Sequence, residues 1–410
     1  MSNTTELTAT LLLDRAVVDE PYDFYRRLIV EAPVWRVPGT DIVVVSSFDA
    51  IAEAVNRPAD FSSNIRSILY RGERGTPEVL PFEGGGATID VLATADPPAH
   101  SIHRSGVFPE LVARRMKALR AEIEAMTDEC LGDALAGAHA EVMGAIATAI
   151  PIRVISRLIG FHHENHDQLL AAAFDSTAML AAVEPKDEVL AAMTRTAEIF
   201  GWIGDQLQRA VDVGGEGILG VIADAVTGGE LDLGDGLVIM HTLLSAGGES
   251  TTSLLGNAIH ILATTPELQA RLRAQPALIS PFIEEAVRLE SPFRHHLRHA
   301  PHATELRGVD IPAGATLLLF WAAANRDPSE YDRPDEVVLD RPAPKHHLGF
   351  GRGIHHCVGA PLARLEAEVV LTELLARTDD FALDHDNPPA RVSSLMVRRF
   401  VRLPLVVATR

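Results

Sequence analysis

The spacing of apolar residues along this chain is mainly helical, because apolar positions recur every three or four residues over most of its length. From residue 97 to about residue 208 one helical stretch follows another, with interruptions near Gly137, Gly160 and Pro185. A long apolar helix is predicted over residues 235–264, and it exceeds the usual length of globular helices. Shorter helices are predicted over residues 23–32, 50–56, 266–273, 279–289 and 360–377.

Strand-like alternation is confined to short segments. Residues 34–37 and 42–46 predict a strand pair around a Pro-Gly turn, residues 304–310 and 316–320 predict two more strands, and alternation returns after residue 377. Strands are therefore expected to form a minor part of the fold.

Two segments lack a clear period. Residues 327–341 are rich in Pro and Asp and are expected to be coil, whereas the longer aperiodic stretch 66–95 predicts a lid or binding loop. No repeat and no flexible linker interrupts the chain, so we expect one mainly α domain with a smaller β region over residues 1–410.

Composition narrows the class of protein. The net charge of −20 argues against nucleic acid or an anionic membrane surface as a partner. No segment reaches the roughly 18–20 consecutive apolar residues of a membrane span. The N-terminal region has no basic segment and no cleavage site, so a soluble cytoplasmic protein without a membrane anchor is expected. No G-x-G-x-x-G loop follows a strand, which argues against a fused flavin or nicotinamide domain.

The two cysteines, Cys130 and Cys357, lie far apart and do not suggest a disulfide framework. Cys130 falls in a helical stretch and is expected to be a small core residue. Cys357 belongs to the run Phe350–Gly359, which fits the template F-G-x-G-x-H-x-C-x-G. A cysteine in such a glycine-bent loop can expose its sulfur on one side while backbone N–H groups stabilise the thiolate on the other. This arrangement predicts a thiolate that holds a haem iron, and the alternative is a buried, inert cysteine in a turn.

The run around Cys357 closely resembles the haem-binding loop of the cytochrome P-450 family. The resemblance implies that fold, with a long central helix over the haem, and heme b (iron protoporphyrin IX) as the cofactor. It also implies that Cys357 is the axial iron ligand, that Phe350 packs beside the sulfur, and that His355 reaches a haem propionate. Gly351 and Gly359 of the same loop are expected to contribute to cofactor binding. Family members of this type are haem-thiolate monooxygenases that use O2 as co-substrate.

Further basic residues resemble the family's propionate clamp. His100 and Arg104 stand four residues apart and share one helix face, and Arg298 resembles a third ligand beside His355. Each of these residues, taken alone, is compatible with an ordinary surface side chain.

The run Ala246–Thr252 lies midway along the long predicted helix. Two adjacent glycines, Gly247 and Gly248, should cost that helix on the order of 2 kcal/mol. The resemblance implies that they open a groove for O2, with Glu249 as the acid and Ser250 as the alcohol of a proton-delivering pair. Ser250 departs from the family's usual Thr but keeps the hydroxyl. The alternative is a packing kink against a neighbouring helix.

Glu285 and Arg288 form an E-x-x-R pair that matches the family's structural ion pair, with Arg341 as its third member. The expected role is to support the thiolate loop. Alone, such a pair also fits a solvated helix face.

Weaker signals concern histidines. His162 and His166 have a spacing that can hold a metal, but a polar helix start is favoured because no further ligand cluster is nearby. For His295 and His296 a pocket lining, a distal iron ligand and a solvated turn all stay open.

The resemblance implies a ferredoxin, fed by a reductase, as electron donor. A local basic patch could dock it, with the candidates Arg114, Arg115, Arg352, Arg364, His346, His347 and His356. The expected substrate is a largely apolar small molecule such as a terpenoid, fatty acid or polyketide-like compound. A peroxide-using haem-thiolate enzyme and a non-catalytic haem-thiolate sensor are the alternatives.

Overall fold

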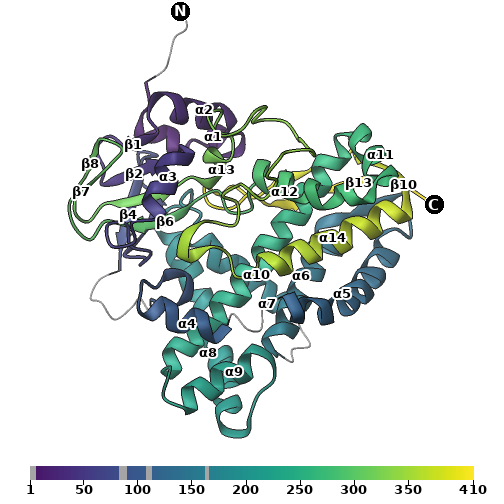
Figure 1. Ribbon diagram of the computed structural model, residues 1–410, viewed down its shortest axis with the longest axis horizontal. Coiled ribbons are helices and arrows are strands. Elements are labelled where there is room, and N and C mark those ends of the chain that lie inside the picture. The colour runs from purple at the N-terminus through teal and green to yellow at the C-terminus, as the bar shows by residue number, and fades with distance from the viewer. Residues whose placement is uncertain (1–5, 83–89, 108–112, 162–165) are drawn as a thin grey trace, which may run out of the picture.

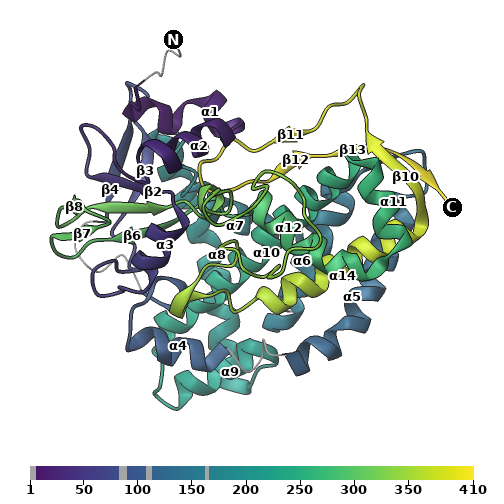
Figure 2. The ribbon, with the colours of Figure 1, turned by 45° about the horizontal axis from the view of Figure 1, so that its top comes forward.

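The computed structural model describes residues 6–82, 90–107, 113–161 and 166–410. Helices make up most of this part of the chain, and the strands gather on one side, around β1, β2 and β6, and near the C-terminus at β10 and β13 (Figures 1 and 2). The predicted fold class, mainly α with a smaller β region, is confirmed. No described helix combines the length and apolar composition needed to cross a bilayer.

The described helices include all of those predicted from the apolar spacing. Their bounds are α1 Arg15–Asp19, α2 Tyr22–Glu31, α3 Phe48–Val55, α4 Ala99–Val107, α5 Ala113–Ala134, α6 Ala149–Ile159, α7 His166–Ala178, α8 Lys186–Val213, α9 Gly217–Thr227, α10 Leu233–Ala263, α11 Pro266–Ala274, α12 Ile279–Leu289, α13 Trp321–Ala324 and α14 Ala360–Arg377. The short helix α9 was not predicted, and its buried Ile218, Leu219 and Ile222 join the helical core.

The strands form small sheets. Their bounds are β1 Val34–Arg36, β2 Ile42–Val45, β3 Ser67–Arg71, β4 Pro77–Pro81, β5 His139–Glu141, β6 His296–His299, β7 Thr304–Leu306, β8 Val309–Ile311, β9 Thr316–Leu319, β10 Thr378–Leu383, β11 Ala390–Arg391, β12 Phe400–Arg402 and β13 Pro404–Thr409. The largest sheet has the order β1-β2-β9-β6, in which β2 and β9 are parallel and the outer pairs are antiparallel. This sheet places β6 at an edge, beside the helical part of the molecule.

The predicted loop over residues 66–95 is wrong in its first half, which forms the antiparallel hairpin β3–β4. The alternation of apolar and polar residues does not reveal these strands, because Ile68 and Leu69 are consecutive and both buried. Prolines also occupy the first and last positions of β4, at 77 and 81. Residues 83–89, which include the glycine run 84–86, lie outside the described residues.

The long helix α10 is the centre of the helical part, and α6, α7, α8 and α14 pack around it (Figure 1). Its first turn is capped by Asp232, whose carboxylate accepts a hydrogen bond from the Asp235 N–H at 2.6 Å. Between residues 241 and 260 the only exposed position is Ala246. The middle of α10 is therefore enclosed on all sides, and its polar residues must find partners within the protein.

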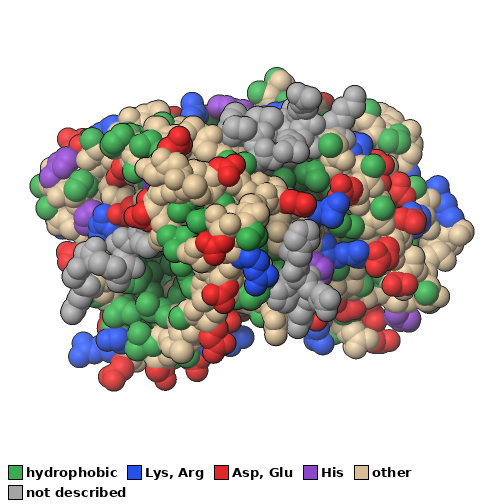
Figure 3. Space-filling model, turned by 90° about the horizontal axis from the view of Figure 1, so that it is seen from below, with side chains coloured by type: hydrophobic (Ala, Val, Ile, Leu, Met, Phe, Trp, Pro, Cys, Tyr) green, Lys and Arg blue, Asp and Glu red, His purple; other side chains and the backbone are tan. Residues whose placement is uncertain are grey.

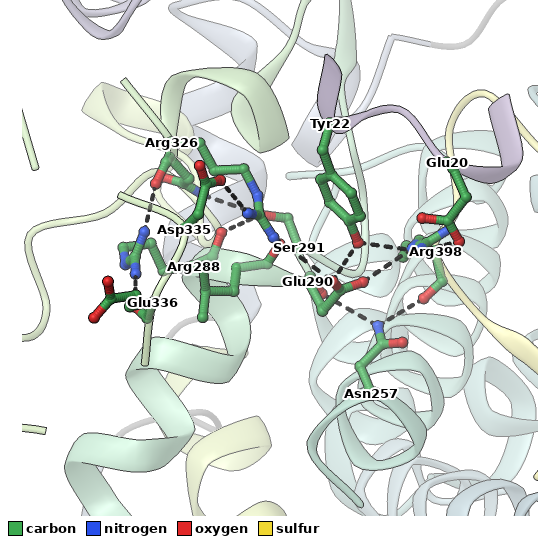
Figure 4. Close-up of polar contacts among 12 residues, drawn as sticks. Glu20, Tyr22, Asn257, Arg288, Glu290, Ser291, Arg326, Asp335, Glu336 and Arg398 are labelled. Atoms are coloured by element: carbon green, nitrogen blue, oxygen red, sulfur yellow. Dashed lines mark hydrogen bonds and ion pairs between the residues drawn. The ribbon is translucent and has the colours of Figure 1, made fainter. Parts of the chain in front are cut away.

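A buried polar cluster joins the N-terminal helix α2, the end of α12 and the C-terminal segment (Figure 4). Glu290 accepts hydrogen bonds from Tyr22 and from Nε of Arg398, the latter at 2.9 Å. Nη2 atoms of Arg326 and Arg391 each lie 3.6 Å from the same carboxylate. Asparagine 257 of α10 donates to the backbone oxygens of residues 290 and 398. Three distant parts of the chain are thus held to one carboxylate.

The molecule's surface mixes acidic and basic side chains on the face shown in Figure 3, and hydrophobic side chains line a hollow toward one side of that face. The excess of acidic residues is spread among basic ones there. The acidic side chains on this face therefore form no single acidic block, although the net charge is −20.

Candidate functional site

The loop that carries Cys357 is bent by glycines. Gly351 and Gly353 adopt φ values of +66° and +74°, which L side chains rarely adopt. The Cys357 N–H donates to the Phe350 carbonyl at 2.8 Å, which closes the loop. The thiol is accessible. Surrounding protein raises its pKa by desolvation, and N–H groups of Gly359 and Ala360, at the start of α14, bond to the sulfur and act in the opposite direction. This geometry suits a thiolate that binds a metal on its open side.

Phe350 is held by a second cluster on the same side. The guanidinium of Arg364 lies 4.3 Å from the Phe350 ring centroid, and it donates to both oxygens of Glu284 at 2.7 and 3.0 Å. His347 also bonds to Glu284, at 3.0 Å. Burial alone would raise the pKa of Glu284, but His347 and Arg364 hold it down to about 2. Glu284 was missed in the sequence because its partners lie more than sixty residues away.

Two candidates for the docking patch are already engaged within the chain. Arg364 is engaged with Glu284, and His347 is buried, so neither offers a free charge to a partner. Arg352, His346 and His356 are exposed, although His346 bonds to Glu330. The side chains at positions 114 and 115 lie outside the described residues.

The residues of the predicted ion pair meet in the structure. Arg288 donates to both oxygens of Glu285 at 2.7 and 2.9 Å, and Arg341 adds a third bond at 2.9 Å. Arg288 also donates to the backbone oxygens of Asn325, Pro334 and Glu336. The pair thus fixes the coil segment that leads to the cysteine loop, where the predicted coil over residues 327–341 is confirmed.

The four predicted anion-binding residues lie in one region. The His100 and His355 ring centroids are 4.3 Å apart, and the charges of Arg104 and Arg298 both act on His355. Burial, followed by Arg298, lowers the pKa of His355 to about 3. Its Nε2 atom is buried and has no hydrogen-bond partner among the described residues. Arg298 is 8% exposed, its Nη1 donates to the Leu297 carbonyl at 2.7 Å, and it forms no ion pair among the described residues. A buried cation and an orphaned ring nitrogen fit an anionic group such as a haem propionate.

On the α10 side, the glycines have a packing role. A Cβ at Gly247 would lie 2.8 Å from Cγ1 of Ile155 in α6, and one at Gly248 would lie 3.3 Å from Cβ of Ala173 in α7. The close approach of α6 and α7 therefore requires small residues here. Ser250 donates to the carbonyl of Ala246 at 2.6 Å, and α10 is continuous through this turn.

Glu249 is fully buried and turned toward neighbouring elements. Its Oε1 accepts from Arg399 at 2.8 Å and from Ser253 at 3.2 Å, and its Oε2 accepts from Thr177 of α7 at 3.0 Å. Burial raises the pKa of Glu249, while Arg399 and Thr177 oppose that rise. Arg399 lies 150 residues from Glu249 along the chain, so no local signal could have identified this pair.

No group of three or more His, Cys, Asp or Glu residues able to hold a metal ion occurs among the described residues. His166 begins α7, whereas positions 162–165 lie outside the described residues. His295 and His296 are not in a solvated turn, because His295 is 3% exposed and β6 starts at His296.

Comparison with known proteins gives matches over nearly the whole chain. A family model described as cytochrome P450 matches residues 221–402. Cytochrome P450 144 of Mycobacterium tuberculosis is 40% identical over 390 residues, which cover 95% of this chain and 89% of that protein. Beta-dihydromenaquinone-9 omega-hydroxylase of Mycobacterium bovis is 31% identical over 97% of this chain and 78% of its own length. The crystal structure of CYP109E1 from Bacillus megaterium with testosterone superposes with a TM-score of 0.86, at 24% identity, and covers 96% of this chain and 99% of that one.

Proposed function

This chain belongs to the cytochrome P450 family and is a monooxygenase, and we propose that it inserts one oxygen atom of O2 into a largely apolar small molecule with electrons from a ferredoxin and its reductase. The family implies a haem-thiolate cofactor. Haem b, once bound, would supply O2 activation and oxygen transfer. The observation that carries the proposal is the accessible Cys357 thiol, enclosed by N–H groups and flanked by a cluster of anion-binding residues.

In this proposal Cys357 ligates the iron, and Phe350, Gly351 and Gly359 shape the loop around the sulfur. Thiolate donation requires that the sulfur stays deprotonated, and the Gly359 and Ala360 N–H groups favour that form.

The propionates would be held by His100, Arg104, Arg298 and His355. The support is the orphaned Nε2 of His355 and the buried Arg298 guanidinium, which has a backbone hydrogen bond but no ion pair among the described residues. Glu285, Arg288 and Arg341 keep the preceding coil in place. These residues have a structural role and take no part in the chemistry.

Proton delivery is assigned to Glu249 and Ser250. The Ser250 hydroxyl donates a hydrogen bond to the Ala246 carbonyl, so the lone pairs of its oxygen are free to accept one. Glu249 is held by Arg399 and Thr177, so it must leave these partners before it can pass on a proton. Arg399 is therefore a positioning residue that controls when Glu249 is released.

The apolar substrate class has support from the relatives. One relative is a hydroxylase of beta-dihydromenaquinone-9, and one structural neighbour was solved with testosterone. Both compounds are large and mainly apolar. The ferredoxin donor is carried over from the family, whose bacterial members typically take electrons from a ferredoxin and its reductase.

The proposal is tested first by optical spectroscopy of the reduced carbon-monoxide complex. Wild-type protein should give the band typical of a thiolate ligand, and Cys357→His should give the histidine-type band. A histidine-type band in the wild type would overturn the assignment. Cys130→Ser is the matched control, because Cys130 is a buried residue of α5 and should leave the spectrum unchanged.

The proton roles are tested by coupling, measured as product formed per NAD(P)H consumed. Ser250→Ala should lower coupling and raise peroxide release, whereas Ser250→Thr, which keeps the hydroxyl, should retain coupling. Equal coupling in all three proteins would remove Ser250 from the mechanism.

A further inference from the structure

A small cavity of about 50 Å3 lies beside β6. Its walls are mainly apolar, with Leu69, Leu180 and Met396 among them, and its polar contribution comes from two neighbouring histidines, His295 and His296. Liquid water takes up about 30 Å3 per molecule, so the cavity has room for one small functional group. In both imidazoles Nδ1 is hydrogen-bonded to the protein, and Nε2 has no hydrogen-bond partner among the described residues.

The tautomer of His296 is set by Trp321. The indole Nε1–H donates to Nδ1 of His296 at 2.6 Å, and an indole can only donate. Nδ1 therefore carries a lone pair, and the proton of the neutral ring sits on Nε2. Trp321 is 3% exposed, so protonation of Nδ1 would leave a buried donor without a partner. His296 consequently offers a hydrogen-bond donor.

The tautomer of His295 is the opposite one. Its Nδ1 lies 3.3 Å from the Leu395 carbonyl, which can only accept, so Nδ1 carries the proton. Nε2 of His295 is then an acceptor, and it has no partner among the described residues. The residue is 97% buried and lines the cavity, so a group inside the cavity can reach this nitrogen. Burial lowers the pKa of both rings, to about 3 for His295 and about 4 for His296, which keeps them neutral.

We propose that this cavity binds a hydroxyl group of the substrate, which donates to Nε2 of His295 and accepts from Nε2–H of His296. The inference rests on the proposed function, because it names the substrate class of that enzyme: an apolar molecule that already carries an alcohol group. A carboxylate or an ether cannot donate to His295, and an ammonium group cannot accept from His296. A neutral hydroxyl satisfies both rings, and its volume suits the cavity.

The experiment measures binding to the haem-loaded protein by calorimetry. Three alcohols with different carbon skeletons, dodecanol, borneol and androstanol, are each compared with their methyl ether, which can accept but cannot donate. In the wild type at least one alcohol should bind about three- to tenfold more tightly than its ether, as expected for one additional hydrogen bond. His295→Leu should bring that ratio to about one.

Met396→Leu is the matched control, since Met396 lines the same cavity without a polar hydrogen and the swap conserves volume. The ratio should survive this change. A ratio near one for every skeleton in the wild type, absence of binding by all three alcohols, or a ratio that His295→Leu leaves unchanged would each overturn the inference. A ratio unchanged by His295→Leu would also be expected if His296 alone bound an oxygen atom, such as a carboxylate oxygen of the cofactor.

Histidine-selective 15N NMR provides a second measurement if His295→Leu does not fold. The unprotonated Nε2 resonance of His295 should move on addition of the alcohol and stay in place with the ether; no difference between the two would contradict the inference. The carbon-monoxide spectrum is recorded in parallel. A thiolate-type spectrum without alcohol preference defeats only this inference, whereas a histidine-type spectrum in the wild type defeats the proposed function.

Discussion

Replacing Glu290 by Gln tests whether the buried cluster in Figure 4 holds the molecule together. Glu290 is the single carboxylate that Arg398, Arg326 and Arg391 share, at 2.9, 3.6 and 3.6 Å. Burial alone would raise the pKa of Glu290, but the three guanidinium groups hold it down to about 2. Gln keeps the size and removes the charge, so all three guanidinium groups would lose the carboxylate that they share. Among the described residues, only Arg326 would keep a close one, Asp335 at 2.6 Å, and the site has little access to water.

The magnitude follows from the pKa. A decrease from 4.5 to about 2 corresponds to roughly 3 kcal/mol in favour of the folded state at neutral pH, within the about 3–5 kcal/mol expected for a broken buried pair. With an unfolding entropy of about 2.1 cal/mol/K per residue, a chain of 410 residues should lose about 4 °C in Tm.

The assay is thermal unfolding of the haem-loaded protein as a function of pH. The folded-state pKa is depressed, so the contribution is present above about pH 4.5 and is lost as pH falls toward about 2. Glu20→Gln is the matched control, because Glu20 lies 3.9 Å from the same Arg398 but is 74% exposed. Its Tm should change by less than about 1 °C. If both variants unfold at the same temperature, the reasoning about the buried cluster is wrong.

Three further predictions each concern a substitution at one site of the protein. Burial raises the pKa of Glu366 to about 8, so the folded protein retains a proton that the unfolded chain loses above about pH 4.5. The free energy of unfolding should therefore fall as the pH rises from about 4.5 to about 8. Glu366→Gln should abolish that fall in urea unfolding measured against pH, and a parallel fall in the variant would contradict the reasoning. Gly247→Ala should destabilise the protein by about 1–3 kcal/mol, because its Cβ would meet Ile155. Gly201→Ala should stabilise α8 by about 0.5–1 kcal/mol, because its Cβ would meet no atom of the described residues within 4 Å beyond the adjoining helix backbone. The same assay checks both, and equal effects would show that the contact with Ile155 is unimportant. Arg399→Gln should raise the pKa of Glu249 further, because it removes a cation that opposes the effect of burial. The protonated carboxyl band in infrared spectra should therefore persist to higher pH than in the wild type, whereas Arg402→Gln, at an exposed position of β12, should leave the band unchanged. An unchanged band in Arg399→Gln would show that Arg399 does not lower the Glu249 pKa.

Interactions within one element could be predicted from the sequence. The Glu285–Arg288 pair and the His100–Arg104 spacing each fall within one helix, and helical periodicity fixes which side chains share a face. The cysteine loop could be predicted for a similar reason, since its turns depend on glycines within ten residues. The long helix α10 followed from an apolar run that no strand of ordinary length could accommodate.

Side-chain contacts between elements that are distant in the sequence could not be predicted. Arg364 on α14 was expected to face a protein partner, yet it pairs with Glu284 eighty residues earlier. The sequence shows an Arg at a helix position but not which neighbour covers it. The same holds for Trp321, whose single donor fixes the tautomer of His296, and for Arg399 beside Glu249. Each of these contacts depends on where strands and helices meet.

The motif in α10 divides into a packing part and a chemical part. Gly247 and Gly248 are required by the approach of α6 and α7, so they would be kept in a protein with this packing whatever its chemistry. Glu249 is different, because a carboxylate in the middle of a buried apolar helix costs free energy that an apolar residue of similar size would not. Arg399, Thr177 and Ser253 offset that cost, yet burial still raises the pKa of Glu249. A carboxyl group kept under such conditions, one residue from the Ser250 hydroxyl, is typical of a group used to move protons.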